Sequence, residues 1–224
     1  MDRPAKLVPH ISAQSAFVDG TLAVLAGRQH GVAARRQLLA EGFTRHLVQD
    51  RITSGHLTPI HRGVYAVGHR KLTLKGVWMG AVLAGGPGAG LSHRAALALW
   101  DLGRSESGLI DVTVPGRTGR HGPRGVRVHR SKLLRETDVT EVDGIPVTSL
   151  AWTVIDYAAL ANRQQVRLVL EALERRLIYI GRELDELLER TPNRKGVKPS
   201  ERRSPTSKDP RRGCNPSSST PSAN

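Results

Sequence analysis

Carboxylates are the side chains whose number and spacing bear most directly on catalysis in this chain. Nucleotidyl transfer needs a Gly-Ser loop followed by an Asp-x-Asp strand, because two carboxylates must bridge Mg²⁺ to the phosphates. Gly108 and the stretch Asp111-Val112-Thr113 supply one carboxylate only. The sequence also lacks the Asp…(Asp/Glu)-x-Lys strand of a nuclease metal centre. We therefore expect the protein not to be an enzyme.

Nine histidines raise the question of metal binding. His93, His121 and His129 lie in turn or strand contexts, but their spacings match no ligand motif. Ser92 is better interpreted as the N-cap of a helix over 94–99, with His93 in its first turn. The glycine-rich stretch 85–90 lacks the Lys-Ser/Thr ending of a phosphate-binding loop and contains a proline, so we interpret it as a linker between helices. The sequence thus predicts no metal site and no cofactor.

Positive charge dominates the composition. The formal net charge is +14 and the isoelectric point is about 11.1, which favours a polyanionic partner such as nucleic acid. Arg120 and Arg124 lie in a loop over 117–127 that would join strands at 110–115 and 126–130 as a hairpin. Two interpretations of this loop stay open, namely an auxiliary contact with nucleic acid and simple solvated charge.

The segment 44–53 has the pattern of a helix that reads DNA. Thr44 is a good N-cap, Val48 and Ile52 are spaced to face a core, and Gly55 is placed to end the helix. Two strands, 57–60 and 63–67, follow and are joined by a tight turn at His61-Arg62-Gly63. The side chains that we expect to contact DNA lie on the exposed helix face or at this turn: Arg45, His46, Gln49, Arg51, Thr53, His61 and Arg62.

Side-chain chemistry assigns different tasks to these residues. Gln and Arg make bidentate contacts with adenine and guanine edges, whereas Arg62 at a turn suits a phosphate or the minor groove. Two alternatives remain, a merely solvated helix face and a protein–protein module. Asp50 would repel phosphates unless it accepts a hydrogen bond from cytosine or pairs with Arg35 or Arg36.

The elements that position these residues predict an α+β fold. Apolar residues at helical spacing indicate two short helices that end near Gly31 and Gly42, so three helices precede the two strands. This order is typical of a winged helix-turn-helix. We expect a flexible N-terminus over 1–18, the winged helix-turn-helix over 19–69, and a small α/β domain with a helical C-terminal part over 70–190. A basic tail rich in Ser, Pro and Arg should be disordered over 191–224.

Four stretches in the expected order resemble a known family, the actinobacterial AbiEi-type antitoxins. They are His61-Arg62-Gly63-Val64-Tyr65-Ala66-Val67-Gly68, Leu91-Ser92-His93-Arg94-Ala95-Ala96, Asp111-Val112-Thr113-Val114-Pro115 and Asp143-Gly144-Ile145-Pro146-Val147-Thr148-Ser149. The resemblance extends from about residue 20 to 196. It implies a winged-helix DNA-binding domain, an α/β domain, and the antitoxin and transcriptional-regulator role of a type IV toxin–antitoxin system. Such a protein regulates its own promoter and neutralises a nucleotidyltransferase-like toxin.

The chain departs from the family pattern in three places. Ala34 stands where the family often has a capping Thr or Ser, and Trp152 stands where it often has Arg. Many relatives continue into a Vsr-like nuclease domain, but this sequence changes to the Ser/Pro/Arg tail near Gly196. An alternative function follows from that departure: the chain is the DNA-targeting remnant of such a nuclease.

Location and further partners follow from what the sequence lacks. The single cysteine, Cys214, offers no disulfide framework, and no secretion signal precedes the first helix, so we expect the cytoplasm. No run approaches the roughly 18 apolar residues of a membrane span, so we expect no membrane partner. The apolar helical repeat over 150–177 would pack on the sheet, and any remaining apolar face would serve a homodimer or the toxin.

Overall fold

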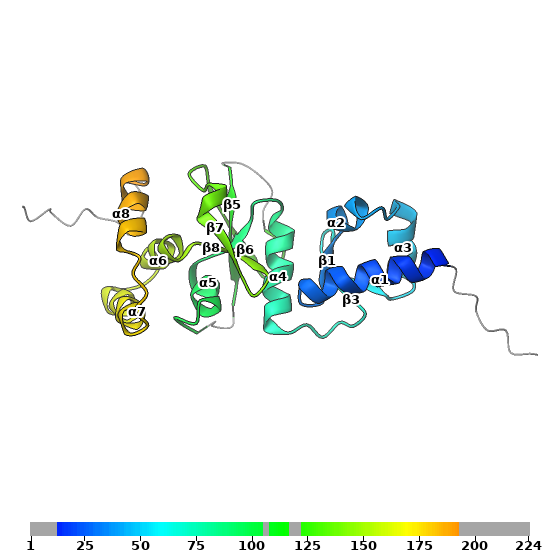
Figure 1. Ribbon diagram of the computed structural model, residues 1–224, viewed down its shortest axis with the longest axis horizontal. Helices are drawn as coiled ribbons and strands as arrows, with labels where there is room; N and C mark the ends of the chain where they lie inside the picture. The colour runs from blue at the N-terminus through cyan, green and yellow to red at the C-terminus, as the bar shows by residue number, and fades with distance from the viewer. Residues whose placement is uncertain (1–12, 105–107, 117–121, 193–224) are drawn as a thin grey trace, which may run out of the picture.

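The computed structural model describes residues 13–104, 108–116 and 122–192. Within these residues the chain is a mixed α+β protein with eight α-helices and two sheets, one of three strands and one of five. The helices and strands form successive layers along the long axis of the molecule (Figure 1). The N-terminal elements lie at one end and the C-terminal helices at the other. The expected α+β class is confirmed, and the expected tail over 191–224 lies almost wholly outside the described residues.

The N-terminal elements pack around a core of their own. Their order is α1 (Ala13–Arg28), β1 (Val32–Ala34), α2 (Arg35–Ala40), α3 (Arg45–Thr53), β2 (Leu57–His61) and β3 (Val64–Val67). The strands form an antiparallel sheet in the order β1-β3-β2. Leu38, Val48, Leu57 and Tyr65 meet in a buried cluster beneath the three helices. Helices α2 and α3 and the two-stranded hairpin agree with the sequence prediction to within a few residues. Helix α1 begins at Ala13, inside the stretch expected to be flexible, and β1 was not predicted.

The second sheet contains five short strands. Its elements are α4 (Leu74–Gly85), β4 (Gly90–Leu91), α5 (His93–Leu99), β5 (Ile110–Pro115), β6 (Val126–Ser131), β7 (Val139–Val142) and β8 (Ile145–Thr148). A short 3₁₀ turn, Glu136–Asp138, precedes β7, and the strand order is β6-β5-β4-β8-β7. The glycine-rich stretch 85–90 therefore links a helix to strand β4, and not directly to the next helix as expected.

Strands β5 and β6 run parallel, with Asp111 opposite Arg127 and Thr113 opposite His129. The predicted hairpin around Arg120 and Arg124 is therefore wrong. A hairpin joins antiparallel strands, whereas parallel strands require a connection that returns to the starting end of the sheet.

Helix α4 lies between the two sheets and contacts strands of both (Figure 1). It is apolar on nearly every side, and all residues from Trp78 to Leu83 are buried, as expected for a helix that passes through the core. Two glycines allow the N-terminal elements to approach it closely. A Cβ at Gly76 would lie 2.6 Å from the backbone oxygen of His30, and one at Gly80 would lie 2.8 Å from Cδ1 of Ile60. One core therefore joins the two sheets, with Val32 and Val64 packed in the same cluster as Trp78.

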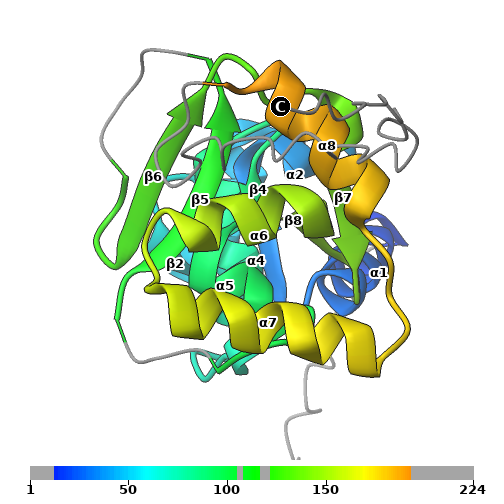
Figure 2. The same ribbon diagram turned by 90° about the vertical axis from the view of Figure 1, so that its left-hand side faces the viewer.

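Three further helices cover the far side of the five-stranded sheet: α6 (Leu150–Ala158), α7 (Arg163–Arg175) and α8 (Gly181–Arg190). Helix α6 packs on α5, and α7 and α8 pack on α6, so the last two lie one layer farther from the sheet than expected (Figure 1). Figure 2 shows the molecule from this end, with α6, α7 and α8 toward the viewer. Trp152 on α6 is fully buried in this layer, among Leu134, Ile155 and Leu187. Across the described ranges, no helix combines the length and hydrophobicity that a membrane crossing requires.

Candidate nucleic-acid interface

Helix α3 is fixed in orientation by its cap and by one apolar face. The Thr44 hydroxyl accepts a hydrogen bond from the Leu47 backbone N–H at 3.1 Å and so caps the helix. Val48 is fully buried, and Ile52, one turn later, packs partly buried against the same cluster. The opposite face is therefore turned to solvent.

Four of the predicted DNA contacts share that exposed face: Arg45, His46, Gln49 and Thr53. Asp50 also lies there and forms an ion pair with His46, at 2.9 Å between Oδ2 and Nδ1. Its partner is thus His46 and not Arg35 or Arg36. The Thr53 hydroxyl donates a hydrogen bond to the Gln49 carbonyl oxygen at 3.0 Å and is therefore directed back to its own helix. The Gln49 side chain is the longer of the two and reaches farther from the helix.

Arg51 does not share this face. Its side chain is only 14% exposed and pairs with Asp19 of α1 at 2.9 Å. Arg51 therefore links α3 to α1 through this ion pair. Its position does not support its assignment as a DNA contact. Helical spacing alone could not separate Arg51 from Gln49, because the partner lies in a different helix.

Arg62 lies at the exposed tip of the β2–β3 hairpin. Gly63 completes the tip with a left-handed backbone (φ 73°), and its carbonyl oxygen accepts from the Arg35 backbone N–H at 2.8 Å, which ties the hairpin to α2. His61, just before the tip, is half-buried, and this burial lowers its pKa below the ordinary value. Arg62 is thus free to meet a partner, whereas His61 favours the neutral form and faces partly inward.

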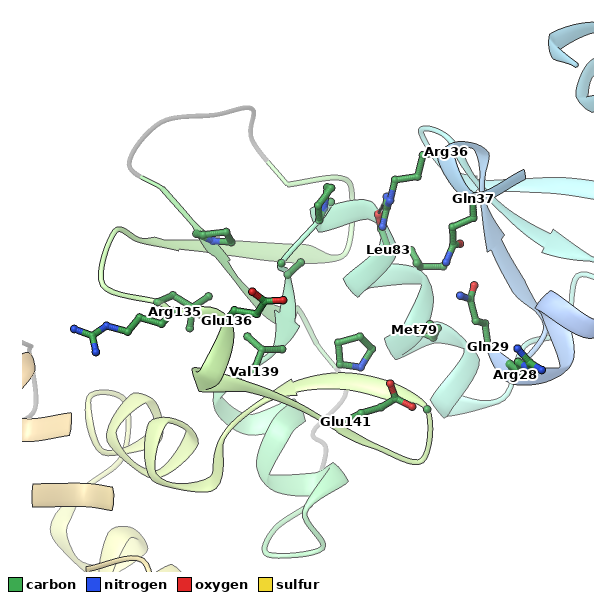
Figure 3. Close-up of a pocket in the computed structure, with 18 residues that line it drawn as sticks. Arg28, Gln29, Arg36, Gln37, Met79, Leu83, Arg135, Glu136, Val139 and Glu141 are labelled. Atoms are coloured by element: carbon green, nitrogen blue, oxygen red, sulfur yellow. Dashed lines mark hydrogen bonds between the residues drawn. The ribbon is translucent and has the colours of Figure 1, made fainter. Parts of the chain in front are cut away.

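A cavity of about 810 Å³ lies between the N-terminal elements and the five-stranded sheet, beside the core that they share. Arg36 and Gln37 of α2 line one side of it, and Met79 and Leu83 of α4 another (Figure 3). Arg36 donates to the Leu83 carbonyl oxygen at 2.8 Å, and its burial lowers its pKa. Arg36 therefore anchors the helix that precedes α3 to the rest of the molecule.

Of the two loop arginines, the structure describes only Arg124, and it lies away from α3. Arg124 is exposed in the turn before β6, in the five-stranded sheet, whereas α3 packs on the three-stranded sheet. Arg120 lies outside the described residues.

A polar cluster that the sequence did not predict lies on the other side of the five-stranded sheet from α4. His93, Asp111 and His129 converge there, with candidate ligand atoms within 4.8 Å of one another. Ser92 does not cap α5 with its side chain as expected; its hydroxyl is 3.0 Å from Nδ1 of His93. The three residues come from the start of a helix and from two parallel strands, so no local spacing motif joins them.

No family model matches the chain, and no curated protein matches it.

Proposed function

We propose that α1–α3 with β1–β3 form a winged helix-turn-helix and that this unit binds double-stranded DNA. The element order and the antiparallel strand order β1-β3-β2 support this assignment. The observation that carries it is the division of α3. Val48 is buried on one face, whereas Arg45 and Gln49, the two residue types that read base edges, are exposed on the other.

Electrostatics supports the same proposal. The whole chain carries a net charge of +14, which attracts a polyanion over long range. Asp50, the acidic residue on the reading face, is paired with His46, so its repulsion of phosphates is reduced whenever that histidine is protonated. Arg62 at the hairpin tip is placed to contact the backbone or the minor groove beside the groove that α3 occupies.

The wider role that we propose is that of a transcriptional regulator and antitoxin of a type IV toxin–antitoxin system in the cytoplasm. This step rests on the sequence resemblance. The C-terminal helical layer offers a surface for a second macromolecule, either a nucleotidyltransferase-like toxin or another copy of the chain. Leu168, Leu177 and Tyr179 are exposed there, with 72% of Leu177 and 80% of Tyr179 accessible to solvent.

Binding and cleavage of DNA are to be measured on the same full-length protein. We expect fluorescence anisotropy to show binding to the DNA that precedes its own gene, with affinity falling steeply as salt rises. Arg45→Ala should weaken binding. Arg182→Ala on α8 removes the same charge from an exposed site in another layer, so it is the matched control.

The alternative function is the DNA-targeting remnant of a Vsr-like nuclease whose catalytic domain is missing, and cleavage of plasmid DNA in the presence of Mg²⁺ by the purified chain would favour it. We expect binding without cleavage, because the carboxylate pair that such chemistry needs is missing from the sequence. Cleavage by the wild type, or equal binding by Arg45→Ala and Arg182→Ala, would contradict the proposal.

A further inference from the structure

The cluster of His93, Asp111 and His129 is assembled by the fold from three separate elements. Asp111 lies on β5, His129 on the neighbouring parallel strand β6, and His93 at the first residue of α5. Candidate ligand atoms of the three side chains lie within 4.8 Å of one another. The side chains of Asp111 and His93 are 5% and 7% exposed, and that of His129 is 29% exposed. Imidazole and carboxylate groups in this number are a ligand set for a transition-metal ion.

Two buried carboxylates lie against the histidine rings of the cluster. Asp111 and Asp156 are both buried. Asp111 accepts from Nε2 of His129 at 2.7 Å, and Asp156 of α6 lies 3.6 Å from Nδ1 of His93. The two imidazole rings stack with their centroids 3.9 Å apart. Nitrogen and carboxylate oxygen atoms are thus gathered in one poorly solvated place, as in a site for a transition-metal ion.

Two polar groups lie next to one nitrogen of His93, and only the nearer is within hydrogen-bond distance. Its Nδ1 faces the Ser92 hydroxyl at 3.0 Å and the Asp156 carboxylate at 3.6 Å. A carboxylate close to a ligating histidine helps to fix the orientation of its ring and raises its basicity.

The cluster opens to a cavity of about 690 Å³, which His93, Thr113, His129 and Asp156 help to line. The Thr113 hydroxyl is buried at this cavity and has no hydrogen-bond partner among the described residues. A buried hydroxyl without a partner is unfavourable unless a water or ligand satisfies it. The site therefore has room for an ion with an open coordination position beside it.

We propose that His93, Asp111 and His129 bind one divalent transition-metal ion of the zinc class, with Asp156 as a positioning residue for His93. Bonds of about 2.0–2.2 Å would place tetrahedral ligand atoms roughly 3.4 Å apart. The ion would therefore replace the proton that Asp111 and His129 share in their hydrogen bond. The His129 ring would have to rotate away from the His93 ring, on which it is stacked. Its partial exposure allows that rotation.

Nearby positive charge limits how tightly the ion is held. Nη1 of Arg127 lies 3.6 Å from Oδ1 of Asp111, and Arg130 and Lys132 line the same cavity. Arg127 is half-exposed and can move toward solvent when the ion binds. Imidazole ligands favour Zn²⁺ and Co²⁺ over Mg²⁺, which prefers oxygen ligands. The site is thus distinct from a magnesium centre for phosphoryl transfer, and it is independent of the proposed DNA binding.

The test is titration of the full-length, chelator-stripped protein with the metals alone. We expect calorimetry to show one tight equivalent of Zn²⁺ and none of Mg²⁺, and we expect Zn²⁺ to raise the melting temperature. The Co²⁺ complex of the protein should absorb visible light, with the spectrum of an ion bound by nitrogen and oxygen ligands. His129→Gln should lower Zn²⁺ affinity by more than about 100-fold, and Asp156→Asn by about 10- to 100-fold.

His69→Gln removes an exposed histidine far from the cluster in sequence, so it should bind Zn²⁺ like the wild type. Asp111→Asn tests the buried carboxylate, and circular dichroism shows whether this variant folds. Because His129 is partly exposed, His129→Gln is the variant that we expect to fold. Absence of tight Zn²⁺ binding by the wild type would overturn the proposal. Equal affinity in wild type and His129→Gln would overturn it as well, since the ion would then be held by other histidines or by Cys214.

Discussion

Replacing Gly76 by alanine tests whether the two sheets are packed on α4 as tightly as the structure indicates. In most exposed helices this exchange is favourable, because alanine has a higher helix propensity than glycine by about 0.8–1 kcal/mol. At Gly76 the added Cβ would lie 2.6 Å from the His30 backbone oxygen and 3.3 Å from Cβ of Leu72. A backbone oxygen cannot rotate away, so the N-terminal elements would have to shift.

The expected magnitude follows from the cost of forcing an extra methyl group into a packed interior. Overpacking typically costs about 1–3 kcal/mol, and a clash with a backbone oxygen belongs at the upper end of that range. After the gain in helix propensity is subtracted, the net loss is about 2 kcal/mol, so at roughly 2–4 °C per kcal/mol the melting temperature of Gly76→Ala should fall by about 4–8 °C. Gly80→Ala should cost less, because its nearest atom is the flexible Cδ1 of Ile60.

Gly20→Ala is the matched control. Gly20 lies within α1, and nothing lies within 4 Å of a Cβ built there. This variant should be neutral or more stable by up to about 1 kcal/mol. Thermal unfolding by circular dichroism would rank the three variants. If Gly76→Ala were stabilised as much as Gly20→Ala, the close packing of α4 against the α1–β1 connection would be refuted.

Three further substitutions test the N-terminal elements on their own. Leu38 is fully buried, so Leu38→Ala should lower the free energy of unfolding, measured by chemical denaturation, by about 2–5 kcal/mol. Its neighbour Leu39 is 38% exposed, and Leu39→Ala should lower it by less than about 1 kcal/mol. Similar losses in the two variants would contradict the assigned helix face. Thr44→Ala should cost about 1 kcal/mol through loss of the N-cap, and a neutral result would remove the hydroxyl's capping role. Burial lowers the pKa of His61, so His61 binds a proton more readily in the unfolded chain than in the folded one. The stability should therefore decrease as the pH falls below about 6.5. In His61→Gln the melting temperature should depend less on pH over this range. An unchanged pH profile would show that His61 is equally solvated in both states.

The parts of the fold that the sequence predicted best are those with local signals. Thr44, Val48, Ile52 and Gly55 mark the cap, the buried face and the end of α3, and each acts within a few residues of the chain. The β2–β3 hairpin likewise has its turn and strands in one continuous stretch. Such features depend on backbone preference and side-chain period, which a single sequence displays directly.

The features that the sequence did not predict depend on contacts between distant segments. Strand β1 has three residues, too few to show a period, and is defined by its pairing with β3. The parallel pairing of β5 and β6 is decided by the sheet and not by the loop between them. Arg51 has a partner, Asp19, on another helix, and His93 meets Asp111 and His129 only after three elements have packed. The candidate metal cluster could therefore not be found from ligand spacing.

The proposal that the exposed face of α3 reads DNA is tested most directly by sequence preference. Wild type, Arg45→Ala, Gln49→Ala and Arg62→Ala would each select from a library of random duplexes, and binding to the selected site would be measured over a range of salt. We expect Gln49→Ala to relax the preference at one base pair by about 1–3 kcal/mol. Arg62→Ala should weaken all duplexes alike and reduce the salt slope by about one phosphate contact. If folded Gln49→Ala and Arg45→Ala both selected the same site as the wild type with the same affinity, the proposed reading face would be wrong.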